Sequence, residues 1–62
     1  MDLFVLYEGQ FESEAVAVFK SEEIARDYLE KNRCSPSEYH LVQVRANEPY
    51  SYDAPVVWGY ND

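Results

Sequence analysis

The run Leu3-Phe4-Val5-Leu6-Tyr7 decides the fold of this 62-residue chain, because both of its alternate sets of side chains are apolar. Leu3, Val5 and Tyr7 fall on one side of an extended strand, and Phe4 and Leu6 fall on the other. This pattern is typical of a strand that is covered on both faces. We therefore predict that residues 3–7 form the central strand of a sheet.

Other short apolar runs predict the strands around it. Residues 8–14 are polar and contain one glycine, which suits a hairpin loop leading to a second strand at residues 15–19. Residues 39–45 alternate in polarity and predict a third strand. Residues 56–58, Val-Val-Trp, are a candidate for a short fourth strand.

One helix is predicted over residues 22–32. Ser21 can cap its N-terminus, and Glu22 and Glu23 suit the positive end of the helix dipole. Pro36 follows the predicted end. Four apolar residues share one stripe of this helix: Ile24, Ala25, Tyr28 and Leu29.

These elements predict an α+β fold of ββαβ type. The hairpin makes the first two strands antiparallel, and the helix returns the chain so that the third strand runs parallel to the second. Since the strand at residues 3–7 belongs in the middle, the spatial order is 2-1-3, with the helix on one face. We predict a domain over residues 1–47 and an aromatic tail over residues 48–62. The second sheet face needs a cover, supplied either by the tail or by a second copy of the protein.

The charge balance bears on the partner class. Lys and Arg total 5 against 12 Asp and Glu, for a net charge of −7. An excess of acid opposes direct binding to nucleic-acid phosphate or to an anionic membrane, because both depend on clustered cations. No apolar stretch is long enough to span a membrane, and Asp2 stands where a signal peptide has basic residues. We expect a cytoplasmic protein, in the host cytoplasm if the source is viral.

The sequence holds little that points to catalysis. One cysteine excludes an internal disulfide, and one cysteine with one histidine cannot build a zinc site. Cys34 follows the C-terminal end of the predicted helix, which does not activate a thiol, and His40 shares a strand face with valines. We expect no enzymatic activity, no cofactor and no metal.

Two groups of side chains are candidates for binding a partner. The acidic candidates lie in the hairpin and on the helix: Glu8, Glu12, Glu14, Glu22, Glu23, Asp27 and Glu30. The aromatic candidates lie in the tail: Tyr50, Tyr52, Trp58 and Tyr60. The acids are either a solvated surface or an imitation of nucleic-acid phosphates that occupies a basic groove. Two predicted i,i+4 pairs, Glu22–Arg26 and Asp27–Lys31, interrupt the acidic row of the helix. The aromatics either cap the open sheet face or serve as binding hot spots.

Residues 3–45 resemble a family of very small bacterial and phage proteins of unknown function. The resemblance rests on the segments Phe4-Val5-Leu6-Tyr7-Glu8-Gly9, Val16-Ala17-Val18-Phe19, Ser21-Glu22-Glu23, Ala25, Tyr28-Leu29-Glu30-Lys31-Asn32 and Tyr39. It implies the ββαβ fold and no defined activity, and the residues from Glu48 onward depart from it. By class alone, small acidic phage proteins resemble inhibitors of host defence, of the anti-CRISPR or anti-restriction type.

The expected function is therefore that of a dimeric, non-enzymatic phage or prophage protein. It would inhibit a host defence nuclease or polymerase by binding its basic surface. The alternative is a structural or regulatory accessory protein that associates through its aromatic tail and open sheet face.

Overall fold

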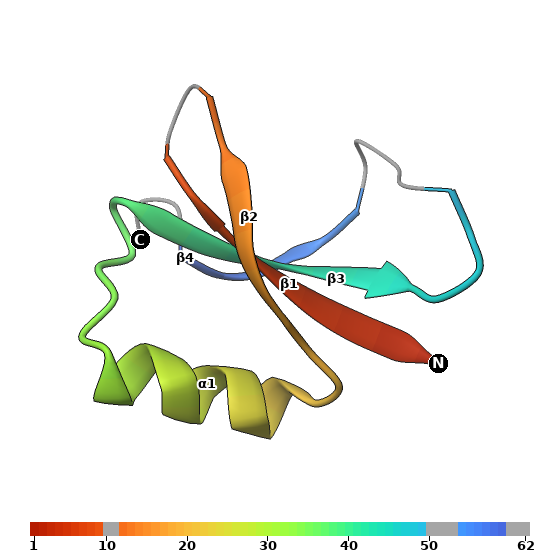
Figure 1. Cartoon of the computed structure of the whole chain (residues 1–62), viewed down its shortest axis with the longest axis horizontal. Coiled ribbons are helices and arrows are strands. Elements are labelled where there is room, and N and C mark those ends of the chain that lie inside the picture. The colour runs from red at the N-terminus through yellow and green to blue at the C-terminus, as the bar shows by residue number, and fades with distance from the viewer. Residues whose placement is uncertain (10–11, 50–53, 60–62) are drawn as a thin grey trace.

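The computed structural model describes residues 1–9, 12–49 and 54–59 and contains one four-stranded sheet and one helix (Figure 1). The elements are β1 (Asp2–Glu8), β2 (Glu14–Phe19), α1 (Glu22–Lys31), β3 (Tyr39–Arg45) and β4 (Val56–Gly59). The strand order is β2-β1-β3-β4, and each neighbouring pair is antiparallel. The predicted order 2-1-3 is confirmed, and the candidate fourth strand extends the sheet beyond β3.

The core lies between the sheet and α1. Leu6 and Leu41 stand opposite each other on β1 and β3, and both are fully buried. Phe4 is buried on the same face of β1, and Ala25 and Leu29 meet this face from the helix. The helix therefore covers the sheet face that carries Phe4 and Leu6, which is one of the two apolar faces predicted for β1.

The ends of α1 follow the predicted signals. Ser21 has extended backbone angles, and its hydroxyl accepts a hydrogen bond from the Ile24 amide at 3.1 Å. At the other end Asn32 donates both its backbone and its side-chain amide to the Tyr28 carbonyl oxygen. These caps occupy backbone groups that the helix itself leaves unpaired.

The sheet buries only part of the predicted apolar stripe of α1. Ala25 and Leu29 are buried, but Ile24 is 58% exposed and Tyr28 is 37% exposed. Two of the four residues of the predicted stripe are therefore buried against the sheet. The helix packs on the sheet through Ala25 and Leu29, and Ile24 lies outside this contact. The Tyr28 ring packs against the Phe19 ring, with ring centroids 5.2 Å apart.

The second sheet face carries the other side chains of β1. Leu3, Val5 and Tyr7 alternate with the buried Phe4 and Leu6, so they point away from α1, and they are half-buried. On the same face of β3, His40 and Val42 are buried.

The described part of the tail, residues 54–59, continues the sheet sideways. Trp58 stands opposite Leu41 and packs against the core cluster on the helix side. Trp58 therefore does not cover the open sheet face, because it lies on the side of the sheet that α1 covers. Tyr50, Tyr52 and Tyr60 lie outside the described residues.

Gly59 allows β4 to approach β3 closely. Its φ of +89° is unfavourable for other residues, and a Cβ there would collide with the Tyr39 carbonyl oxygen. The last position of β4, which lies beside the start of β3, is therefore suited to glycine.

Across residues 1–9, 12–49 and 54–59, no helix has the length and apolar character needed to cross a membrane.

Candidate functional site

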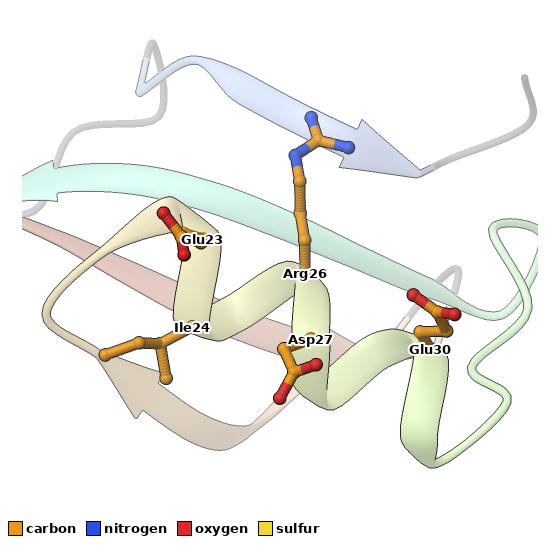
Figure 2. Close-up of a pocket in the computed structure, with 5 residues that line it drawn as sticks. All are labelled: Glu23, Ile24, Arg26, Asp27 and Glu30. Carbon is orange, nitrogen blue, oxygen red and sulfur yellow. The ribbon is translucent and has the colours of Figure 1, made fainter.

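The outer surface of α1 has two flanks with different side chains. Figure 2 shows Glu23, Arg26 and Glu30 on the side of the helix nearer β4, and Ile24 and Asp27 on the other side. These five residues line a depression of about 510 Å³. It is shallow, because a single helix supplies all of its lining.

A second depression lies between the helix and the fourth strand. Its volume is about 370 Å³, and it is lined by Arg26, Leu29, Glu30, Cys34 and Trp58. We call this feature, together with Glu23 one helical turn before Arg26, the α1–β4 groove. The fold thus brings an acidic candidate, Glu30, to the same depression as an aromatic candidate, Trp58, although 28 residues separate them in the sequence.

Arg26 ties α1 to β4. Its Nε donates to Glu22 Oε2 at 2.7 Å, and its Nη2 donates to the Val57 carbonyl oxygen at 3.1 Å. The guanidinium is therefore already engaged by groups of its own chain. The predicted Glu22–Arg26 pair is confirmed, but the bond to Val57 spans 31 residues and has no signature in the sequence.

The second predicted helix pair is also present. Lys31 Nζ lies 3.1 Å from Asp27 Oδ2, and both side chains are largely exposed. Exposed pairs of this kind contribute only about 0–1 kcal/mol. Their main effect is on charge, because Glu22 and Asp27 each have a cation beside them.

Glu23 and Glu30 are the helix carboxylates that keep an uncompensated charge. Both are exposed, and neither is in an ion pair with the part of the chain that the structure describes. They stand seven residues apart on the β4 flank, which is two helical turns. Their spacing places negative charge along the length of the α1–β4 groove.

The hairpin carboxylates form a separate group. Figure 1 shows the β1–β2 hairpin projecting from the side of the sheet opposite to α1. Glu12 and Glu14 are exposed there, whereas Glu8 accepts a hydrogen bond from the Tyr39 hydroxyl at 3.0 Å. This bond and the Glu8 charge raise the pKa of Tyr39. The seven predicted acidic residues therefore belong to two surfaces, and do not form one continuous face.

Cys34 lies half-buried in the α1–β4 groove. Burial, and then the negative charge of Glu8, raise the pKa of its thiol from the ordinary value of 9.0. The thiol is therefore protonated at neutral pH. The sequence argument against an activated thiol relied on the helix C-terminus and missed Glu8, which is 26 residues away.

His40 is buried on the sheet face away from α1. Its ring stacks on Tyr7 with centroids 5.2 Å apart and an angle of 14° between the planes. Burial lowers the pKa of His40 below its ordinary value of 6.5, because the charged form loses solvation. The side chain belongs to the packing of this face.

This burial predicts a pH dependence of stability. Because the folded state holds His40 with a lowered pKa, the unfolded state binds more protons between that pKa and about 6.5. The free energy of unfolding should thus be highest above about pH 6.5 and should decrease as the pH falls through this window. Urea unfolding at several pH values should show the decrease in the wild type and a flatter profile in His40→Phe. Parallel profiles for the two proteins would assign the effect to other groups.

Within residues 1–9, 12–49 and 54–59, no group of three or more His, Cys, Asp or Glu side chains is arranged to hold a metal ion.

Comparisons with protein-family models, with curated proteins and with solved structures returned no match to this chain.

Proposed function

We propose that the protein is a non-enzymatic binding protein whose α1–β4 groove receives basic side chains of a protein partner. The observation that carries this proposal is the position of Glu30 and Trp58 in one depression, with Glu23 further along the same helix flank. A cation from a partner would meet carboxylates at the rim and an aromatic ring within reach.

The chemistry of the groove favours arginine or lysine as the bound group. Glu23 and Glu30 supply negative charge that no cation of the described residues neutralises. Arg26 does not oppose an incoming cation at full strength, since Glu22 neutralises it and Val57 holds its guanidinium. Trp58, which is partly exposed, supplies apolar surface for the methylene groups of a long basic side chain.

The partner class follows from the whole chain. With a net charge of −7, the protein is attracted over long range to surfaces rich in Lys and Arg. Such surfaces are typical of proteins that bind nucleic acids. We infer a cytoplasmic inhibitor of a host nuclease or polymerase, encoded by a phage or prophage. The last part of this inference rests on the resemblance to small acidic phage proteins.

A charge-reversal pair tests this proposal. Glu23→Lys combined with Glu30→Lys leaves the Glu22–Arg26 and Asp27–Lys31 pairs intact and should abolish capture of the partner from a bacterial lysate. The matched control, Glu12→Lys combined with Glu38→Lys, changes the net charge equally at exposed loop positions outside the groove. It should weaken capture only slightly.

The comparison separates local contact from overall charge. If both double variants lose the partner equally, the net charge acts and the groove does not. If neither loses it, the acidic surface of α1 is not the binding site. Circular dichroism of each variant establishes that the fold is retained.

The alternative is a structural accessory protein that associates through the tail and the open sheet face. Of its anchors, the open sheet face carries Leu3, Val5 and Tyr7, and Trp58, the described aromatic residue of the tail, already packs against the core cluster. This position favours a structural contribution of Trp58 and leaves the acidic groove as the better-supported site.

A further inference from the structure

The flank of α1 nearer β4 carries charges in alternating order. Glu23, Arg26 and Glu30 lie on this flank in Figure 2, and all three residues are exposed. They stand at positions i, i+3 and i+7 of the helix, so the second and third follow the first by about 4.5 Å and about 10.5 Å along the axis. The α1–β4 groove therefore presents a negative, a positive and a negative group at fixed intervals.

Each group of this row can bond to a partner. Glu23 and Glu30 form no ion pair with the part of the chain that the structure describes. Arg26 donates its Nε–H to Glu22 and one Nη2–H to the Val57 carbonyl oxygen. A guanidinium has five N–H groups, so Arg26 keeps donors for an acidic side chain of a partner. A complementary segment must thus offer a basic, an acidic and a basic side chain in this order.

The intervals favour an α-helix as the backbone of that segment. A helix that lies along α1 repeats its rise per residue, so its own positions i, i+3 or i+4, and i+7 face the three groups. Side chains on one face of a strand follow each other at about 6.7 Å and 13.4 Å, which misses the second and third groups by about 2–3 Å. A polyproline II segment repeats at about 9.3 Å and has no side chain on the same face to meet the middle group.

We propose that the α1–β4 groove binds a basic α-helix of a partner protein, with two basic side chains seven residues apart and an acidic side chain between them. The inference rests on the proposed function and names the form of its partner. The two basic side chains pair with Glu23 and Glu30, and the acidic one accepts from Arg26. The basic side chain at Glu30 also lies against Trp58, which lines the same depression.

The charge pattern argues against a second copy of this chain as the occupant. α1 is the one helix in the part of the chain that the structure describes. Its cations, Arg26 and Lys31, are five residues apart, so they point in directions about 140° apart around the helix axis. Both are already paired, with Glu22 and Asp27. The bound helix must therefore belong to a protein with a different and more basic sequence.

Synthetic peptides test the helical form of the partner. The probe is a stapled, alanine-rich helix of about 18 residues, with two arginines seven residues apart and one glutamate between them. Trp58 is the only tryptophan of the chain and lines the groove, so its fluorescence reports binding of a peptide without aromatic residues. The probe should bind at least about fivefold more tightly than two peptides of equal charge. One of these is a helix with its arginines five residues apart, and the other is an extended, proline-rich peptide.

Variants of the protein identify the contacts. Glu23→Gln combined with Glu30→Gln removes both carboxylates and should abolish binding of the helical probe. The matched control, Glu12→Gln combined with Glu38→Gln, changes the net charge equally outside the groove and should retain the affinity to within about twofold. Glu30→Lys should lose the probe and should bind instead a peptide in which one of the two arginines is replaced by glutamate.

Three outcomes would overturn the proposal. Equal affinity for the three peptides would contradict a helical partner, and the proposed function would survive if Glu23→Gln/Glu30→Gln still abolished binding. Equal loss of the probe from both double variants would assign binding to the net charge and not to the row. No binding of any peptide at millimolar concentration would contradict the helix as well. Capture of a partner from a lysate needs no peptide, so it decides the proposed function separately.

Discussion

Replacing Leu6 with alanine should unfold most of the protein at room temperature. Leu6 is fully buried at the centre of β1, between the helix and Leu41. Truncation of a buried leucine costs about 2–5 kcal/mol. A single small core in a chain of this length supplies no more than about 3–5 kcal/mol. The loss is therefore comparable to the whole free energy of unfolding.

Urea unfolding followed by circular dichroism measures this effect, and Leu3→Ala is the matched control. Leu3 lies on the same strand but on the opposite face, and it is only half-buried. The control should thus lose about 1 kcal/mol or less, since part of its surface is already in water. Equal losses for the two variants would contradict the placement of the core between the sheet and α1.

Gly59→Ala should have the second-largest effect and should detach β4. The added Cβ would overlap the Tyr39 carbonyl oxygen and would lie 3.0 Å from the His40 Cα. Both atoms belong to the backbone of β3, which is paired with β1 on its other side, so they cannot move aside easily. With a φ of +89°, we expect a loss of about 2–3 kcal/mol.

Gly9→Ala separates backbone strain from close approach. Gly9 also has a positive φ, of +108°, but its Cβ would meet the Glu12 carbonyl oxygen at 2.9 Å in the hairpin loop. A loop adjusts more readily than a central strand, so this variant should lose about 1 kcal/mol. Hydrogen exchange of the β3 amides should increase in Gly59→Ala and change little in Gly9→Ala. The reverse order would mean that β4 does not depend on the contact with Tyr39.

The fold was readable from the sequence because a few residues carry strong local signals. Phe4 and Leu6 alternate with Leu3 and Val5, so the position of β1 in the sheet follows from the two apolar faces alone. Ser21 and the residues after it mark the start of α1 to within one residue. Signals of this kind act over a few positions and need no knowledge of the distant chain.

The errors and omissions concern contacts between distant segments. Periodicity identified the apolar stripe of α1, but the width of the surface that the stripe covers depends on where the helix crosses the sheet. Ile24 therefore became exposed. The bond from Arg26 to Val57 and the position of Trp58 beside Glu30 depend on β4 lying next to the helix. No local pattern in either segment predicts that placement.

The candidate site was predicted only in its residue types. The sequence analysis treated the acids as one surface and the aromatics as another. In the structure, Glu30 and Trp58 belong to one groove, whereas Glu12 and Glu14 belong to the β1–β2 hairpin and do not line that groove. The groove combines a member of each predicted set, and this combination is what the proposed function depends on.

The salt dependence of partner binding tests the central claim most directly. The affinity of the captured partner should be measured by calorimetry at low and at high salt, for the wild type and for Glu23→Lys/Glu30→Lys. We predict that the wild-type affinity decreases steeply with salt, because exposed charges are screened beyond about 8–10 Å, and that the variant does not bind. An affinity that is independent of salt, and equal in the two proteins, would contradict the account.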